Sequence, residues 1–297
     1  MSQSGCALVL EGGGYRGLFT AGVIDVLLEN NVTNFSSIWG TSAGALNGAN
    51  FRAGHIGRYV RVSLAFRDDR RMMSFLSLAR TGSIAGNDFL YGEVQNEIDP
   101  FDSERFNAGS PRMWVVASDM MFGTPAYLEV ASLPDDLPKI IASASLPGVS
   151  EEVEIGGSRY LDGGTTDSIP VETALGLESG AVVADYEPVD KAVVVLTRER
   201  AYHKESASEI MPLLRRRYAH YPYYLQMLET RPARYNAQRE RVFDLERQGK
   251  VLVLVPPVSL GLATTERSGE KMLRAYQMGR AQVTERLDEI RTFIEAS

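Results

Sequence analysis

The chain has 297 residues, of which 44% are hydrophobic and 23% charged, and its net charge is −7. This composition allows a sizeable buried core and excludes a disordered chain. The negative charge argues against a general nucleic-acid-binding protein. The single cysteine, Cys6, excludes an intrachain disulfide and a cysteine-rich metal site.

Two further absences bear on where the protein acts. The sequence does not open with a basic and apolar leader. No apolar run approaches the ~20 residues that a helix needs to cross a bilayer. We therefore expect a cytoplasmic protein that contacts a membrane, if at all, from its surface.

The predicted elements begin with a strand, a glycine loop and a helix. Residues 6–10 form an apolar run typical of a buried parallel strand, and apolar residues recur at helical spacing over 18–27. A second strand at 35–39 precedes a helix at 45–51. This βαβα opening predicts a mainly parallel sheet.

The pattern changes twice farther along the chain. Residues 52–102 are mostly helix and loop. Strands, a helix and a hairpin are then expected, in chain order, at 113–118 (strand), 124–130 (edge strand), 137–145 (helix), 152–160 (hairpin) and 191–196 (strand). From about 201 a largely helical stretch rich in arginine and tyrosine runs to 250. A strand at 251–255 and a helix at 266–296 follow, and the late strand indicates a return to the main sheet.

Residues 40–44, Gly-Thr-Ser-Ala-Gly, lie between the second predicted strand and its helix. A G-x-S-x-G motif in this context is typical of a nucleophile elbow, which exposes the serine hydroxyl on a sharp turn. The pattern also arises by chance in a chain with this glycine and serine content. Ser42 is therefore a candidate nucleophile that needs supporting features.

The glycine loop at residues 12–17 matches G-x-G-x-x-G and allows three interpretations. A dinucleotide site would need an acidic residue about 20 positions on, which is absent. A phosphate loop would need a Lys-Ser/Thr ending, which is also absent. We favour an oxyanion hole made by the N–H groups of Gly12, Gly13 and Gly14. Arg16 would add a charge for a phosphate or carbonyl oxygen, or form a salt bridge within the fold.

The base that would activate Ser42 has two interpretations. His203 or His220 would satisfy the chain order of an α/β-hydrolase triad, whereas His55 is expected at the surface. Asp162 is the other candidate. It follows an apolar pair and starts Asp-Gly-Gly, where partial burial would raise its pKa and make it a better proton acceptor. A plain hairpin turn would also explain Asp-Gly.

Taken together, the glycine loop, G-x-S-x-G and Asp-Gly-Gly resemble the patatin-like phospholipase family, in a bacterial branch with a C-terminal extension. Stretches at 114–119, 142–147 and 162–171 look like the same family. The resemblance implies a three-layer α/β/α fold, with a hydrolase domain at 5–200 and an extension at 201–297 packed on the same core.

The resemblance also implies a chemistry. Ser42 would be the nucleophile and Asp162 the general base of a dyad, with the oxyanion held by the glycine loop and no cofactor or metal. The substrate would be a lipid ester, as in a phospholipase A or a lysophospholipase. Two alternatives stay open: a histidine-dependent esterase or thioesterase for soluble esters, and a non-catalytic module that binds acyl chains.

Two stretches are candidates for contact with lipid. Residues 70–78 mix arginines with methionine, phenylalanine and leucine, which suits a lid or interfacial segment as well as core packing. Residues 200–250 hold 11 Lys/Arg against 6 Asp/Glu. Within them, Arg215–Arg217 and nearby tyrosines would bind anionic head groups, although a solvated helix face would look the same.

Overall fold

The computed structural model describes residues 3–69, 71, 88–205, 210–263 and 266–296. In this part of the chain eight strands form one sheet in the order β5-β6-β3-β2-β1-β7-β8, and β4 pairs with β3 beside that path. The strands are β1 (Gln3–Leu10), β2 (Ser37–Thr41), β3 (Arg112–Asp119), β4 (Pro125–Glu129), β5 (Val153–Ile155), β6 (Ser158–Asp162), β7 (Val189–Val195) and β8 (Val251–Leu254).

The centre of the sheet is parallel and one end is antiparallel. Strands β3, β2, β1, β7 and β8 run in the same direction. Strands β4 and β6 both pair antiparallel with β3, and β5 and β6 form the hairpin expected at 152–160. The carboxyl ends of the parallel strands therefore meet at one edge, where α/β proteins place their sites.

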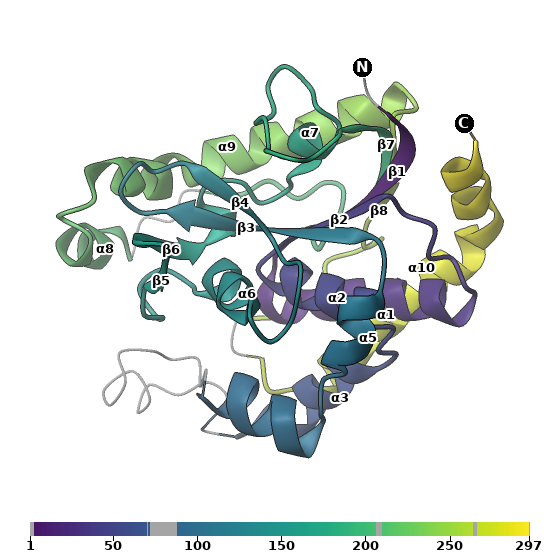
Figure 1. The fold of residues 1–297 in the computed structure, drawn as a ribbon, viewed down its shortest axis with the longest axis horizontal. Helices are drawn as coiled ribbons and strands as arrows, with labels where there is room; N and C mark the ends of the chain where they lie inside the picture. The colour runs from purple at the N-terminus through teal and green to yellow at the C-terminus, as the bar shows by residue number, and fades with distance from the viewer. Residues whose placement is uncertain (1–2, 70, 72–87, 206–209, 264–265, 297) are drawn as a thin grey trace.

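Helices cover both faces of the sheet, as Figure 1 shows with α7 and α9 on one side and α1, α2 and α10 on the other. The helical segments are η1 (Gly14–Arg16), α1 (Gly17–Glu29), α2 (Ala43–Arg52), α3 (Arg58–Ala65), η2 (Asp88–Ile98), α5 (Ser103–Ala108), α6 (Leu137–Ala144), η3 (Gly163–Thr165), α7 (Val171–Ala174), α8 (Met211–Arg217), α9 (Pro222–Arg247) and α10 (Gly269–Glu295).

The central strands are apolar throughout because both of their faces are buried. In β1, Leu8 and Leu10 join the core under α1 and α10, whereas Ala7 and Val9 join the core under α7 and α9. This explains the unbroken apolar run in the sequence. The expected three-layer α/β/α fold with a mainly parallel sheet is confirmed.

The segments after residue 200 are part of these layers. Strand β8 pairs with β7 at one edge of the sheet, helix α9 lies on one face, and α10 crosses α1 on the other. Residues 201–205 of the helical stretch expected from 201 form a loop, and the next described helix, α8, begins at Met211. The stretch at 70–78, for which a lid, an interfacial segment and core packing were all considered, lies outside the described residues apart from Arg71. Among the described residues, no helix has both the length and the apolar composition that a membrane span requires.

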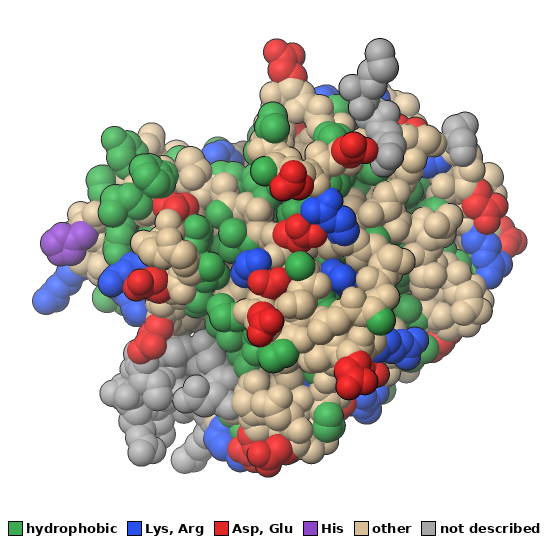
Figure 2. All heavy atoms as spheres, in the orientation of Figure 1, with side chains coloured by type: hydrophobic (Ala, Val, Ile, Leu, Met, Phe, Trp, Pro, Cys, Tyr) green, Lys and Arg blue, Asp and Glu red, His purple; other side chains and the backbone are tan. Residues whose placement is uncertain are grey.

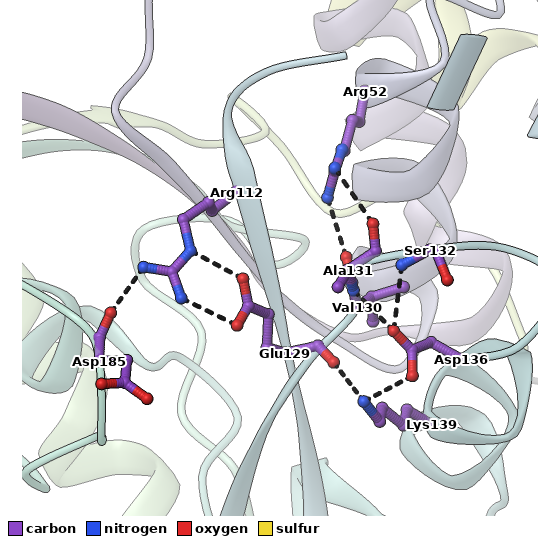
Figure 3. Close-up of polar contacts among 9 residues, drawn as sticks. All are labelled: Arg52, Arg112, Glu129, Val130, Ala131, Ser132, Asp136, Lys139 and Asp185. Atoms are coloured by element: carbon purple, nitrogen blue, oxygen red, sulfur yellow. Dashed lines mark hydrogen bonds and ion pairs between the residues drawn. The ribbon is translucent and has the colours of Figure 1, made fainter. Parts of the chain in front are cut away.

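A polar network fixes β4 and the turn after it (Figure 3). Arg112 forms a bidentate ion pair with Glu129, with nitrogen–oxygen distances of 2.7 and 2.8 Å. Lys139 of α6 bridges the Glu129 carbonyl and the Asp136 carboxylate, and Arg52 of α2 donates to the carbonyls of residues 130 and 131. Through these contacts α2 and α6, the two helices that border the candidate site, are bonded to β4 and the turn after it.

Candidate active site

Ser42 occupies a sharp turn between β2, which ends at Thr41, and α2, which begins at Ala43. Its backbone has φ 57° and ψ −121°, a conformation that a residue other than glycine adopts only when its surroundings impose it. Its N–H donates to Ser143 Oγ at 2.9 Å, which helps hold the turn. The side chain is 7% exposed and lies at the positive end of the α2 dipole.

The flanking glycines are required by close backbone contacts. A Cβ on Gly44 would lie 2.1 Å from the Leu10 carbonyl oxygen, and one on Gly40 would lie 2.6 Å from the Gly44 carbonyl oxygen. No side chain fits at either position. The G-x-S-x-G spacing thus reflects the packing of β1, β2 and α2 around the serine.

Asp162 ends β6 and is 3% exposed. One of its oxygens, Oδ1, accepts the N–H of Gly164 at 2.7 Å, while the other, Oδ2, is buried without a hydrogen-bond partner among the described residues. Burial raises the pKa of this carboxyl, and the Ser42 hydroxyl, the charge of Arg231 and the Gly164 N–H oppose the rise. A desolvated carboxylate with an unused oxygen is suited to accept a proton.

Ser42 and Asp162 face each other across the edge of the sheet. The Ser42 hydroxyl lowers the Asp162 pKa, although among the described residues Oδ2 accepts no hydrogen bond. Such loose geometry is common before a substrate binds and tightens the site. The pair has the composition of a nucleophile and its base.

The glycine loop adjoins the serine, as the motif predicts. A Cβ on Gly12 would lie 3.0 Å from Ser42 Cβ, so this backbone runs directly past the hydroxyl-bearing side chain. Among the described residues, no acceptor is hydrogen-bonded to the N–H of Gly12 or Gly13. The Gly14 carbonyl is held by the Tyr59 hydroxyl at 3.0 Å. The loop therefore presents free donors next to Ser42.

A buried carboxylate below the loop was not predicted. Glu11 is 2% exposed and accepts hydrogen bonds from the backbone N–H of Thr197, from its hydroxyl and from the hydroxyl of Tyr235 on α9. The Thr197 hydroxyl also reaches the Gly12 carbonyl oxygen at 2.9 Å. An acidic residue at the end of an apolar strand is a signal that would have drawn attention to Glu11.

Helix α9 also holds the loop that begins at Asp162. Arg231 donates to the Gly164 carbonyl at 2.6 Å, and Arg234 donates to the carbonyls of residues 165 and 166 at 2.6 and 2.8 Å. Gln238 bonds the Asp167 carboxylate at 2.8 Å. These contacts were not predicted, because side chain to carbonyl bonds between distant segments leave no motif in the sequence.

Two of the three histidines form hydrogen bonds with residues other than Ser42. The ring Nε2 of His55 accepts the Asp102 N–H at 3.0 Å, His203 pairs with the Asn236 amide at 3.0 Å, and His220 is exposed. Among the described residues, no hydrogen bond joins any of the three to Ser42. A histidine-based triad therefore has no geometric support in this structure.

An apolar cavity of about 190 Å³ opens at Ser42. It lies between α2, α3, η2 and α6, and its wall includes Leu46, Val62, Leu90, Leu137 and Ile140. The region expected only as helix and loop at 52–102 thus supplies much of its lining. A cavity of this character holds an alkyl chain better than a polar group. Among the described residues, no cluster of three or more His, Cys, Asp or Glu side chains could hold a metal ion.

Arg16 lies near the same edge and is half-buried. Its Nε is buried without a hydrogen-bond partner among the described residues, and no ion pair to Arg16 occurs there. Burial and the neighbouring Arg198 lower the pKa of this guanidinium, and Glu11 opposes them. The salt-bridge interpretation therefore lacks support, and a role in binding stays a prediction.

Similarity to known proteins identifies the family of this chain. A model of the patatin-like phospholipases matches residues 8–175, more than half of the chain, and the chain therefore belongs to that family. A second model, for a domain of unknown function (DUF6363), matches residues 221–295. The second match covers α9, β8 and α10.

Curated relatives support the same assignment. The uncharacterized protein YjjU of Escherichia coli K12 is 32% identical over 173 residues, which are 57% of this chain and 48% of that protein. The uncharacterized NTE family protein Rv1063c of Mycobacterium tuberculosis H37Rv is 28% identical over 180 residues, 60% of this chain and 48% of that protein. The lysophospholipase NTE1 of Candida glabrata is 27% identical over 176 residues, 58% of this chain and 10% of that protein. The chain thus matches about half, or less, of the length of these relatives.

A solved structure agrees with the fold over nearly the whole chain. VipD from Legionella pneumophila superposes with a TM-score of 0.51 at 16% identity, covering 97% of this chain and 68% of VipD. At this identity the likeness concerns the fold alone. Because the superposition covers 97% of this chain, it extends into the segments after residue 200.

Proposed function

We propose that the protein hydrolyses carboxylic ester bonds of lipids, in the manner of a phospholipase A or lysophospholipase, through a Ser42–Asp162 dyad. One observation carries the proposal. A strained, nearly buried serine faces a desolvated aspartate with an unpartnered oxygen, at the opening of an apolar cavity. Membership of the patatin-like phospholipases supports it.

The geometry suits a two-step acyl transfer. Ser42 Oγ attacks the ester carbonyl carbon while Asp162 accepts the hydroxyl proton. The N–H groups of Gly12, Gly13 and Gly14 stabilise the oxyanion, and the alcohol leaves with the proton from Asp162. Water then attacks the acyl-enzyme and loses a proton to Asp162, and Asp162 passes this proton to Ser42 Oγ as the bond to the fatty acid breaks.

The test is hydrolysis of short- and long-chain p-nitrophenyl esters by the purified protein and three variants. Ser42→Ala and Asp162→Asn should each lower kcat/KM by at least about 10³-fold, because nucleophile and base act as a unit. The double variant His203→Ala/His220→Ala is the matched control and should retain activity. All three should keep the wild-type circular dichroism spectrum.

Two outcomes would contradict the proposal in different ways. Loss of activity in the histidine variant would transfer the base role to histidine and indicate an esterase or thioesterase of the triad type. A folded wild-type protein that hydrolyses neither these esters nor phospholipid vesicles would favour a non-catalytic module that binds acyl chains.

We further propose that the protein meets its substrate as a peripheral protein at a lipid surface. Five large apolar side chains, each more than half exposed, lie in the turn between β3 and β4, at α8 and at the start of α9: Met121, Phe122, Ile210, Leu213 and Tyr223. We call this group the apolar tip. Figure 2 shows hydrophobic side chains gathered at the end of the molecule occupied by α8, with basic side chains beside them.

The three arginines of α8 differ in whether their side chains already bond other groups of the protein. Arg215 is paired with Glu229 at 2.8 Å, and Arg217 donates to the carbonyls of residues 148 and 150. Arg216 is exposed. Of the three arginines expected to bind anionic head groups, Arg216 is therefore the one best suited to do so, and the surrounding apolar side chains would enter the interface.

A further inference from the structure

Four cationic side chains lie around the edge of the sheet that carries Ser42. Arg16 follows the glycine loop, Arg198 follows β7, Lys204 lies in the loop before α8, and Arg231 lies on α9. Three of the four come from the part of the chain beyond the patatin-like match at 8–175. The motifs of the sequence assign none of these three a role.

Two of the cations rest on neighbouring aromatic rings. The guanidinium carbon of Arg198 lies 4.3 Å from the centroid of the Tyr202 ring, and Lys204 Nζ lies 5.4 Å from that of Tyr235. The two rings are 6.3 Å apart. Arg198 and Lys204 are thus held close together on a platform whose polar end, the Tyr235 hydroxyl, is bonded to Glu11.

The other two cations adjoin this platform. A Cβ on Gly13 would lie 3.2 Å from Arg16 Cβ and 2.7 Å from the Thr197 hydroxyl, so Arg16 sits against the residue that precedes Arg198. Arg231 lies one helical turn before Tyr235 on α9, on the same side of the helix. Its Nε bond to the Gly164 carbonyl also ties it to the Asp162 loop.

The cluster carries more positive than negative charge. In the part of the chain that the structure describes, the carboxylates of Glu11 and Asp162 act on these cations, and the Glu11 oxygens accept hydrogen bonds from Thr197 and Tyr235. Burial, together with the charges of Arg231, Arg16 and Arg198, lowers the Lys204 pKa to about 8. Mutual repulsion of this kind is relieved when an anion binds between the cations. Arginine forks and lysine ammonium groups are the protein's usual ligands for phosphate oxygens.

The cluster and the apolar cavity lie on opposite faces of the sheet, with Ser42 between them. Cavity residues such as Leu46 and Ile140 belong with the layer of α1 and α10, whereas Tyr235 belongs with the layer of α9. An ester whose carbonyl lies at Ser42 would therefore extend its acyl chain one way and its alcohol part the other way. The alcohol part would meet the four cations.

We propose that Arg16, Arg198, Lys204 and Arg231 form a binding site for the phosphate group of a glycerophospholipid or lysophospholipid head group. This inference rests on the proposed lipid ester hydrolysis, because the site binds the leaving alcohol of that reaction. It gives residues near and within the DUF6363 region a part in substrate selection.

Binding is measured first, by calorimetry on the Ser42→Ala protein, so that the result does not depend on turnover. The probes are a short-chain phosphatidic acid below its critical micelle concentration, the matching diacylglycerol, glycerol 3-phosphate and inorganic phosphate. The phosphatidic acid should bind at least tenfold more tightly than the diacylglycerol. In a protein that also carries Arg198→Gln and Lys204→Gln, this difference should disappear.

The choice of variants separates binding from folding. The side chains of Arg198 and Lys204 form no hydrogen bond in the described structure, whereas Arg231 holds the Gly164 carbonyl and is left unchanged. Lys271→Gln/Arg274→Gln removes the same charge from the exposed side of α10 and is the matched control. It should preserve the tighter binding of the phosphatidic acid.

Kinetics of the active protein give the second readout. The ratio of kcat/KM for the short-chain phosphatidic acid to that for the diacylglycerol should fall at least tenfold in Arg198→Gln/Lys204→Gln and stay unchanged in the α10 control. Equal binding of the two lipids, or a preference that survives the double variant, would overturn the inference. So would binding of inorganic phosphate without tighter binding of the phosphate-bearing lipid. Absence of turnover in every protein would count against the proposed hydrolysis while leaving the binding result to decide the phosphate site.

Discussion

At the residue scale, the environment of Asp162 makes a prediction about pH. A general base must be ionised, and burial raises the Asp162 pKa above its usual 3.8. Activity should therefore fall as the pH drops through this raised pKa. The charge of Arg231 lowers the same pKa, so Arg231→Gln should move the acidic limb of kcat/KM for a neutral ester to higher pH.

The conservative variant separates charge from positioning. Arg231 also holds the Gly164 carbonyl, so Arg231→Gln loses activity for two reasons. Arg231→Lys keeps the positive charge, and its acidic limb should stay near that of the wild type even if kcat falls. An acidic limb at the same pH in the glutamine variant and the wild type would show that Asp162 does not titrate under the influence of Arg231.

The residues of the candidate site differ in how well the sequence predicts them. Ser42 and Asp162 follow from short motifs, because the glycines beside them are required by local backbone packing. Glu11 and Arg234 do not, since their partners lie far away in the chain and include backbone carbonyls, which every residue has. The roles of Ser42, Asp162 and the glycine loop stay predictions until the variants are measured.

At the element scale, the crossing of α1 and α10 depends on two glycines. A Cβ on Gly22 would lie 2.1 Å from the Tyr276 carbonyl oxygen, and one on Gly279 would lie 2.0 Å from the Phe19 carbonyl oxygen. Alanine usually stabilises a helix relative to glycine by about 1 kcal/mol. Here Gly22→Ala or Gly279→Ala must push the helices apart, and each should lower the free energy of unfolding by about 1–3 kcal/mol.

The control for this prediction is a helical glycine with space around it. Gly92 in η2 has no atom within 4 Å of an added Cβ among the described residues. Gly92→Ala should leave the stability unchanged or raise it slightly. Urea unfolding followed by circular dichroism measures all three variants. Equal effects of Gly22→Ala and Gly92→Ala would mean that α1 and α10 do not touch at Gly22.

The elements themselves were largely predictable, with one informative exception. Apolar runs identify β1, β3, β7 and β8, since strands buried on both faces leave an unbroken signal. The helical pattern from 201 includes residues 201–205, which form a loop in the structure. There the backbone N–H of Lys204 bonds the Asn236 side chain, so a contact with α9 replaces the helical hydrogen bond.

At the scale of the whole molecule, the apolar tip makes a prediction about lipid surfaces. Phe122→Ser/Leu213→Ser should weaken co-sedimentation with phosphatidylglycerol-containing vesicles at least tenfold, because burying each side chain contributes roughly 1.5–3 kcal/mol. Arg216→Gln should weaken it less, and the remaining effect should shrink at high salt. Val182→Ser/Val258→Ser, which changes exposed side chains elsewhere, is the control. Equal binding by the tip variant and this control would exclude the apolar tip as the docking surface.

The division into a hydrolase domain at 5–200 and an extension at 201–297 stays a prediction. The two parts pack closely together, because α10 packs on α1 and β8 extends the sheet beside β7. The apolar run at 251–255 predicted the return of β8 to the sheet, whereas the packing of α10 on α1 has no motif in the sequence, since the patatin-like motifs all lie before residue 175. The predicted boundary near residue 200 marks a change in sequence pattern, whereas the packing continues across it.

The bond between Glu11 and Tyr235 spans 224 positions of the chain and has a consequence for biosynthesis. A ribosome makes the glycine loop early and α9 much later. During that interval the loop lacks the hydroxyl that holds the carboxylate below it, and the Asp162 turn lacks its arginines. A nascent or truncated chain that ends before α9 would therefore carry every motif of the family without an assembled site. The proposed hydrolysis would then require α9 to dock, so an unfinished chain would lack the assembled site on which that activity depends.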